Sequence, residues 1–339
     1  MTSPRWSQRP PGSNWGEYGV DDELGRLNDI TPASIQRAAA EIITGQRFSL
    51  SLPLDFPGGQ VLSRFRQPPC QFCVTPADGR QRFSYPMARD DGLTDIECDD
   101  AVTIHTQYST HWDGLAHMGS FFDADQDGTA EQVYYNGFRA GSDIVPPQDG
   151  QSQSRLGLEH AAASGIIWRG VMVDLAAHVE TGGGPAAVGF DLFQRILRDD
   201  GITVEPGDIL CLHTGFADRL LTMNKAPDAA VLAAHAIGLD GRDRALLDWI
   251  TQSGIVAIAA DNFAVETWPA RPPETLPASE LPLHEHCLFK LGILLGELWH
   301  LGPLAHALRS TGRSRFFLSA TPLRLPGAVG SPLTPIGIL

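Results

Sequence analysis

Four short apolar runs, separated by segments with helical spacing, constrain the fold of this 339-residue chain more than any other feature. Each run is predicted to be a buried strand: 170–175, 208–213, 255–260 and 315–320. Between them, residues 190–200 and 243–252 carry apolar side chains at helical intervals. Alternating strands and helices are typical of a mixed or partly parallel sheet covered by helices. We therefore predict an α/β fold.

The N-terminal part adds a helix and a strand to this scheme. Residues 1–16 are rich in Pro, Gly, Ser and Arg and are predicted to form a flexible N-terminal arm, followed by a single domain over 17–339. Thr31 and Pro32 are a helix cap and first helical residue, which predicts a helix that runs to Thr44 and stops at Gly45. Residues 47–54 alternate well enough for a strand.

Two further segments lack a regular pattern. Residues 64–100 contain prolines, glycines and mixed polarity, and loops of that size usually cover a site. The tail, residues 326–339, is rich in Pro and Gly, and its apolar side chains suit packing on a neighbouring subunit.

Charge and composition exclude several classes of function. With 42% apolar and 19% charged residues the chain is globular, and its net charge of −15 argues against nucleic acid and anionic membranes as partners. No apolar run approaches the roughly 20 residues that span a bilayer, and the N-terminus lacks a secretory core. Five scattered cysteines do not form a disulfide framework. We predict a cytoplasmic protein that acts on a small molecule.

Residues 107–117 combine several groups suited to metal binding. In an extended strand Gln107, His111 and Asp113 share one face, together with His105. Imidazole and carboxylate suit zinc, manganese or iron at about 2.0–2.2 Å. His117, four residues after the aspartate, can supply a base that is not a ligand. The alternative is a polar loop whose histidines bind backbone groups.

A second cluster lies far downstream, at His284, His286 and Glu297. The glutamate is 13 and 11 residues from the two histidines, too far for neighbours on one helix. The chain must therefore fold back if these groups share a metal; otherwise they are an ordinary polar helix start and the beginning of the next segment.

Two other polar groups have competing interpretations. Asp123, Asp125 and Asp127 imitate the first half of a calcium loop, but Tyr134 stands where the bidentate glutamate belongs, which favours a polar turn. Asp261 and Asn262 directly follow the run 255–260, where side chains either border a site or cap the next turn.

The sequence resembles the metal-dependent hydrolases of the cyclase family, whose signature is His-x-Gly-Thr-His-x-Asp-x-Pro-x-His. Residues 107–117 read QYSTHWDGLAH and are similar to the longer branch that carries Trp-Asp-Gly. The agreement extends over nearly the whole chain, through the segments 14–16, 22–25, 27–28, 135–137, 169–171, 260–262, 281–284 and 327–332.

This resemblance implies roles for individual residues. His111 and Asp113 would be metal ligands and His117 the general acid/base, with His284 and Glu297 as the downstream pair and His286 as a competing alignment. Gln107 replaces the first histidine of the signature, while Ser109 and Leu115 replace its glycine and proline. The number of metals is therefore open. An oxygen-rich set suits manganese better than zinc, and iron is a further candidate.

The resemblance also implies a fold and an activity. The fold is the swivelling β/β/α type, with a mixed sheet that can curl towards a barrel and helices outside it, assembled as a homodimer or homotetramer. The activity is metal-dependent hydrolysis of a small amide, imide, formamide or lactone, in which Trp112 and Phe121 either stack on a flat substrate or pack in the core. A metal-dependent cyclase or lyase is the alternative enzyme, and a metal-free binding or scaffold protein is the alternative of another class.

Overall fold

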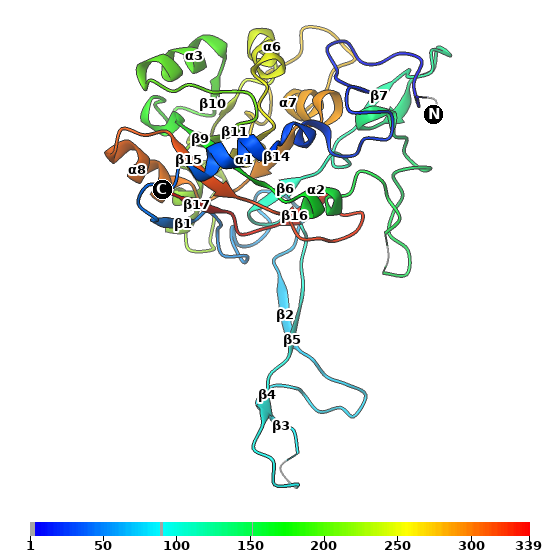
Figure 1. The fold of residues 1–339 in the computed structure, drawn as a ribbon, viewed down its shortest axis with the longest axis vertical. Coiled ribbons are helices and arrows are strands. Elements are labelled where there is room, and N and C mark those ends of the chain that lie inside the picture. The colour runs from blue at the N-terminus through cyan, green and yellow to red at the C-terminus, as the bar shows by residue number, and fades with distance from the viewer. Residues whose placement is uncertain (1–3, 89–90, 151) are drawn as a thin grey trace.

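A nine-stranded mixed sheet forms the centre of the computed structural model, which describes residues 4–88, 91–150 and 152–339 (Figure 1). Strands β9, β11, β13 and β14 run parallel, and the remaining pairs are antiparallel. The order across the sheet is β1 (Arg47–Ser49), β17 (Ile336–Ile338), β15 (Arg315–Ser319), β9 (Ile167–Asp174), β11 (Ile209–His213), β13 (Ala257–Ala260), β14 (Leu294–Glu297), β6 (His111–Asp113) and β16 (Gly330–Pro332).

Helices surround this sheet (Figure 1). They are α1 (Pro32–Ala39), α2 (Glu159–Ser164), α3 (Phe190–Asp199), α4 (Phe216–Thr222), α5 (Ala229–Ala234), α6 (Arg244–Ser253), α7 (Pro282–His284) and α8 (Gly302–Ser310), with short 3-10 turns η1 (Gly25–Asp29), η3 (Tyr135–Gly137) and η4 (Leu175–Ala177) and a π-helix η5 (Glu285–Leu291). The predicted α/β fold with a mixed sheet and outer helices is confirmed.

The sequence patterns explain the central elements. Every residue of β11 and β13 is buried, as expected for strands covered on both faces. Helix α6 begins where the Asp243 side chain accepts hydrogen bonds from two backbone N–H groups, and it ends at Gly254 in the left-handed conformation. Both elements follow from local residues, which is why their predicted positions agree with the structure.

Near the N-terminus, contacts with the C-terminus override the local pattern. Helix α1 ends at Ala39 and not at Thr44, because the backbone N–H groups of Thr44 and Gly45 donate to the carbonyl of Leu339. Strand β1 is also shorter than the predicted 47–54, since Leu50 N–H donates to Pro335 and Leu52 N–H to the Thr110 hydroxyl.

Both ends of the chain pack on its own body. In the predicted N-terminal arm, Trp15 is buried and donates its ring N–H to the Phe289 carbonyl at 2.7 Å, so this residue packs on the body; residues 1–3 lie outside the described residues. The tail supplies β16 and β17 to the central sheet. These two strands of the tail therefore pack within this subunit.

A long projection leaves the body between β1 and β6 (Figure 1). We call residues 64–105 the hairpin extension; it contains the ladders of β2 (Cys70–Cys73) with β5 (Asp100–Thr103) and of β3 (Tyr85–Pro86) with β4 (Ile96–Glu97). The expected loop over a site is instead a projection that points away from its own subunit. Two further two-stranded ladders complete the fold. Strand β7 (Ser120–Phe122) pairs with β8 (Glu131–Val133), and β10 (Ala186–Val188) pairs with β12 (Ile237–Leu239).

Gly25→Ala is expected to destabilise the protein by about 2–4 kcal/mol, since it combines strain with overpacking. Gly25 has φ +59°, and a Cβ there would lie 2.2 Å from the carbonyl oxygen of Gly292. Urea unfolding measures the change. Gly45→Ala is the matched control: φ is +75° but the space is open, so only about 1 kcal/mol is expected. Equal losses would show that the contact with Gly292 is unimportant.

Candidate metal centre

Two antiparallel strands place the first three groups of the site. In β6, His111 and Asp113 are two residues apart and so lie on the same face. Strand β14 pairs with β6 in a register that sets Glu297 opposite His111. The side chains of all three are almost completely buried. The predicted common face of His111 and Asp113 is thus present, on a strand of three residues.

Five ionisable side chains converge here in two overlapping groups that share Asp113: His111 with Glu297, and His117 with His284. Within each group the possible ligand atoms lie within 4.8 Å of one another. The His111 Nε2 atom is 3.4 Å from Asp113 Oδ1 and 3.7 Å from Glu297 Oε2. The His284 Nε2 atom is 3.3 Å from Glu297 Oε1 and 3.8 Å from Asp113 Oδ2. We call these five residues the carboxylate–histidine cluster.

The chain folds back to bring His284 to this cluster. After α7 it forms the π-helix η5, turns at Gly292 with φ +60° and enters β14, which ends at Glu297. His286 faces elsewhere: its Nε2 atom is 2.9 Å from the Thr251 hydroxyl, and burial lowers its pKa to about 4. Of the two downstream histidines, the structure therefore brings His284 to Asp113.

Hydrogen bonds on the far side of each ring orient the two buried histidines. His111 donates its Nδ1–H to the Ser109 carbonyl at 2.7 Å, and His284 donates its Nδ1–H to Glu266 at 2.9 Å. Each ring therefore turns its Nε2 atom towards the carboxylates, which is the arrangement of a metal-ligating histidine.

Glu266 is the functional residue that sequence reasoning missed. Its carboxylate also accepts the backbone N–H groups of Leu283 and His284, and it is 1% exposed. It lies in an irregular segment at no motif spacing from its partners, so its acidic character alone is a weak signal.

Two buried atoms of the cluster have no hydrogen-bond partner: His111 Nε2 and Asp113 Oδ2. A buried polar atom without a partner costs about 1–3 kcal/mol, more when it is charged. A divalent cation would satisfy both atoms, and one imidazole with carboxylate oxygens is a donor set for zinc, manganese or iron. The residues present therefore fit a divalent metal ion.

The charges in the cluster are strongly coupled. Burial would raise the pKa of Asp113, but His117 and His111 hold it well below its usual range. Burial would lower the pKa of His284, but the carboxylates of Asp113, Glu266 and Glu297 around the ring raise it well above normal. For His117, burial dominates and lowers the pKa, with Asp113 offsetting it only in part. His117 is accordingly neutral at neutral pH, while Asp113 is ionised.

Gln107 contacts the cluster through its amide nitrogen. The Nε2–H group donates to Asp113 Oδ1 and lies 3.0 Å from His117 Nδ1. The donor orientation follows from the carboxylate, because a carboxamide oxygen facing Asp113 would be repelled. In this structure Gln107 therefore positions Asp113 and His117, and its oxygen does not face the cluster as a ligand would. His105, predicted to share this face, is exposed.

Three predicted substrate contacts have polar groups that bond to the protein itself. Trp112 is fully buried on the opposite face of β6, packs against Trp299 and donates its ring N–H to Ala320, which makes it a core residue. The Asp261 carboxylate accepts hydrogen bonds from Thr214 and Gly215. Asn262 donates to backbone carbonyls, at 2.7 Å to Ile237. Asp261 and Asn262 thus brace the loops that follow β11 and β13.

A surface recess of about 280 Å³ opens beside the cluster. His117 lines it together with Ser120, Phe121 and Tyr134. The His117 side chain is 21% exposed, and Phe121 is 70% exposed on β7. Of the predicted aromatic contacts, Phe121 is the one placed where a substrate at His117 would meet it.

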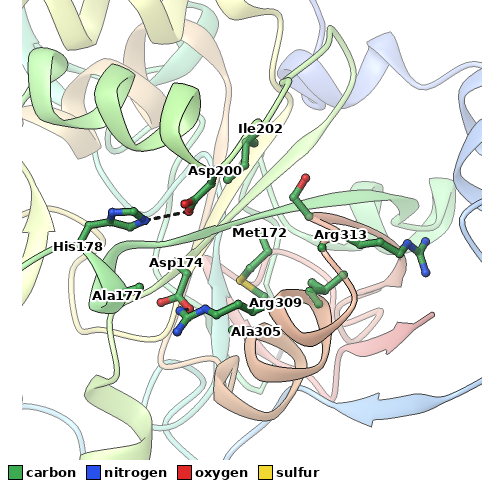
Figure 2. Close-up of a pocket in the computed structure, with 12 residues that line it drawn as sticks. Met172, Asp174, Ala177, His178, Asp200, Ile202, Ala305, Arg309 and Arg313 are labelled. Atoms are coloured by element: carbon green, nitrogen blue, oxygen red, sulfur yellow. Dashed lines mark hydrogen bonds and ion pairs between the residues drawn. The ribbon is translucent and has the colours of Figure 1, made fainter.

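Another cavity, of about 310 Å³, lies elsewhere and has its own paired charges (Figure 2). His178 is 2.9 Å from Asp200, and Arg309 pairs with Asp174, so the charges that line this cavity are paired with one another (Figure 2).

Asp123, Asp125 and Asp127 form the predicted polar turn between β7 and β8, with Gly128 N–H donating to Asp123 at 3.0 Å.

Glu266→Gln is expected to weaken metal binding by roughly 10–100-fold, as is usual when the partner of a ligating histidine is changed. The amide removes the negative charge that favours the Nδ1–H form of His284. Competition with a chromophoric chelator measures the affinity without a substrate. Glu285→Gln is the matched control, since the Glu285 carboxylate accepts from Ser120 and, among the described residues, makes no hydrogen bond with the His284 ring. Equal affinities in both variants would contradict the positioning role of Glu266.

Comparison with known proteins supports the assignment of the fold. The family model described as "Putative cyclase" matches residues 30–267. A crystal structure titled as that of a novel cyclase is 30% identical, covers 96% of this chain and 99% of its own, and has a TM-score of 0.73. Isatin hydrolase A from Ralstonia solanacearum is 16% identical, covers 90% and 94% of the two chains, and has a TM-score of 0.55.

Isatin hydrolase A from Labrenzia aggregata, solved with benzyl benzoate bound, is 13% identical over 92% of this chain and 98% of its own, with a TM-score of 0.56. Comparison with curated proteins gives no match. Among the described residues, no helix combines the length and apolar character needed to cross a membrane.

A curled mixed sheet that carries buried histidines and carboxylates at one edge defines a class of α/β protein with a candidate metal centre. Within that class, the family model matches more than half of the chain and a relative is 30% identical over nearly its whole length. The chain belongs to the cyclase family.

Proposed function

We propose that this protein is a metal-dependent hydrolase that cleaves a small amide, imide, formamide or lactone. The observation that carries the proposal is the carboxylate–histidine cluster, with two unpartnered buried atoms, next to a recess lined by His117. His111, Asp113, His284 and Glu297 would hold the metal, which is manganese, zinc or iron. When bound, such an ion polarises a carbonyl and lowers the pKa of water.

His117 supplies the proton in this proposal. The Gln107 amide donates to Nδ1 of the ring, which leaves the proton on Nε2, 3.8 Å from Asp113 Oδ1. A neutral imidazole is too weak an acid to give up this proton, so His117 would first act as the base that takes a proton from water and then, as the imidazolium, deliver a proton to the leaving nitrogen or oxygen. Because burial lowers the pKa of the ring, His117 is neutral at neutral pH and so available as that base.

Phe121 gives the recess an apolar, aromatic wall, and the recess is open to solvent. An aromatic face of this kind suits a flat ring fused or attached to the scissile group. The titles of two structural neighbours name isatin hydrolase, and the similarity of fold makes a cyclic aryl amide a reasonable member of the proposed substrate class.

The test couples metal analysis with a substrate screen. Purified protein is analysed for manganese, zinc and iron, then assayed with aryl formamides, cyclic imides and lactones before and after chelation. We expect bound divalent metal and a turnover that is lost on chelation and restored by the metal. Bound metal without turnover of any of these classes would overturn the assignment as this kind of hydrolase.

A cyclase or lyase is the second candidate, favoured by the family's description and by the same cluster of ligands. Oxygen-18 water separates the two activities, because hydrolysis places solvent oxygen in the product. A metal-free binding protein is the third candidate and is favoured by Gln107 in place of a histidine. Protein without metal that does not recover it on addition of manganese would support that reading.

A further inference from the structure

Ser120 is a polar side chain of the recess whose hydrogen-bonding role is already fixed by the protein. It begins strand β7 and lines the recess together with His117. Its hydroxyl donates to Glu285 Oε1 at 2.8 Å. A serine hydroxyl carries one proton, so this bond uses the whole donor capacity of the group. Towards a molecule in the recess, the Ser120 oxygen is therefore an acceptor and not a donor.

Glu285 holds this hydroxyl next to the candidate metal centre. It directly follows His284 and begins the π-helix η5, so its backbone is tied to that of a candidate ligand. Among the described residues its carboxylate forms no ion pair, and no neighbouring cation neutralises its charge. A hydrogen bond to a carboxylate is roughly twice as strong as one between neutral groups, and it polarises the hydroxyl. The bond to Glu285 therefore makes the Ser120 oxygen a better acceptor.

The charge around this acceptor favours neutral donors. The described residues that line the recess include no lysine or arginine. An anionic group next to Ser120 would meet the oxygen lone pairs and the negative charge of Glu285, with no cation from the recess wall to offset them. A neutral N–H group meets a matched acceptor instead. A secondary amide or an unsubstituted imide carries an N–H group next to its scissile carbonyl, whereas a lactone places an acceptor oxygen there.

We propose that Ser120 is a specificity-determining residue that accepts a hydrogen bond from the N–H group beside the scissile carbonyl. The substrate is then an amide or imide with a free N–H, and not a lactone. This inference rests on the proposed hydrolase activity and narrows its substrate class. In the cleavage, the C–N bond breaks and its electron pair stays on nitrogen, which takes a proton from the His117 imidazolium, while the water oxygen remains on the carbonyl carbon. The N–H group persists throughout, so Ser120 can hold the nitrogen from the substrate to the leaving group.

The first test compares an aryl formamide with the matching aryl formate, two substrates that differ only in N–H against O beside the carbonyl. The measured quantity is the ratio of their kcat/KM values in the metal-loaded enzyme. Intrinsic reactivity is the same for every variant, so a change in this ratio reports the contribution of the side chain. Ser120 is half-buried, and loss of its hydrogen bond in Ser120→Ala is expected to lower the ratio by roughly 10–100-fold. An unchanged ratio would overturn the proposal.

Two further variants and a control show whether the hydroxyl itself is responsible. Ser120→Thr keeps the hydroxyl and should keep the wild-type ratio. Glu285→Gln keeps the serine, but the new amide can donate to Ser120 and release the hydroxyl as a donor, so the ratio should fall while metal affinity stays at the wild-type level. Ser142→Ala is the matched control, because the Ser142 hydroxyl donates to Asp143 at 3.4 Å outside the recess, and its ratio should not change.

A binding measurement separates this inference from the hydrolase assignment. Calorimetry with the metal-loaded protein compares a benzo-fused five-membered lactam with the lactone of the same shape. We expect the lactam to bind roughly 10–100-fold more tightly to the wild type, and the two compounds to bind equally to Ser120→Ala. This preference without turnover of any substrate would remove the hydrolase assignment but keep the role of Ser120. Equal binding of both compounds to the wild type would remove that role, whether or not hydrolysis is found.

Discussion

Alanine in place of His117 is expected to lower turnover by roughly 10²–10⁴-fold while the metal content of the protein stays unchanged. His117 is the cluster residue that reaches the recess, and the Gln107 amide fixes its tautomer with the proton on Nε2. Its removal takes away the proton carrier. The other four residues of the cluster keep their places, because β6, β14 and α7 hold them independently of the His117 ring.

The measurement is kcat for whichever substrate the screen identifies, together with metal analysis of the same preparations. His105→Ala serves as the control: it removes an exposed histidine from the same stretch and should leave both quantities at the wild-type level. Full activity of the His117 variant would remove this residue from the reaction. Loss of both metal and activity would make His117 a ligand instead of a proton carrier.

Asp113→Asn is expected to weaken metal binding by at least about 100-fold, beyond the 10–100-fold that follows from changing a residue around the ligands. Asp113 belongs to both groups of the cluster, and its Oδ2 atom is one of the two without a partner. Asparagine keeps the shape of the side chain but removes the charge that would neutralise a divalent ion. Because Asp113 is a member of both groups, this one change affects both of them at once.

Chelator competition and elemental analysis measure this effect without an activity assay. Asp123→Asn is the matched control, since Asp123 belongs to the acidic turn between β7 and β8, whose carboxylates accept turn N–H groups. Circular dichroism shows whether both variants remain folded. Wild-type affinity in the Asp113 variant would mean that the metal, if present, is bound somewhere other than the carboxylate–histidine cluster.

The elements that local residues determine were predictable from the sequence. Strands β11 and β13 follow from continuous apolar runs, and α6 follows from its Asp243 cap and its terminal glycine. The end of α1 was not predictable, because the N–H groups of Thr44 and Gly45 donate to the carbonyl of Leu339, about 300 residues away along the chain. The place of β17 was not predictable either, because one of its two partner strands, β1, lies about 290 residues away along the chain.

The candidate site shows the same division. His111 and Asp113 could be paired from their spacing, and the family resemblance linked them to His284 and Glu297. Spacing could not choose between His284 and His286; the π-helix and the turn at Gly292 decide it. Glu266 could not be found, since its contact with His284 depends on the path of an irregular segment. Trp112 adjoins two candidate ligands, and the sequence left both substrate stacking and core packing open for it. Because side chains alternate between the two faces of β6, its ring lies in the core.

The position of β16 and β17 has a consequence for the order in which the protein can fold during synthesis. Strand β16 borders β6, which carries His111 and Asp113, and β17 lies between β1 and β15. Until residues 330–338 have left the ribosome, β6 is an open sheet edge and β1 has no partner strand. The sheet edge beside the candidate metal centre is therefore closed only once β16 has been translated, and a nascent chain paused before residue 330 should retain less metal than the longer chain.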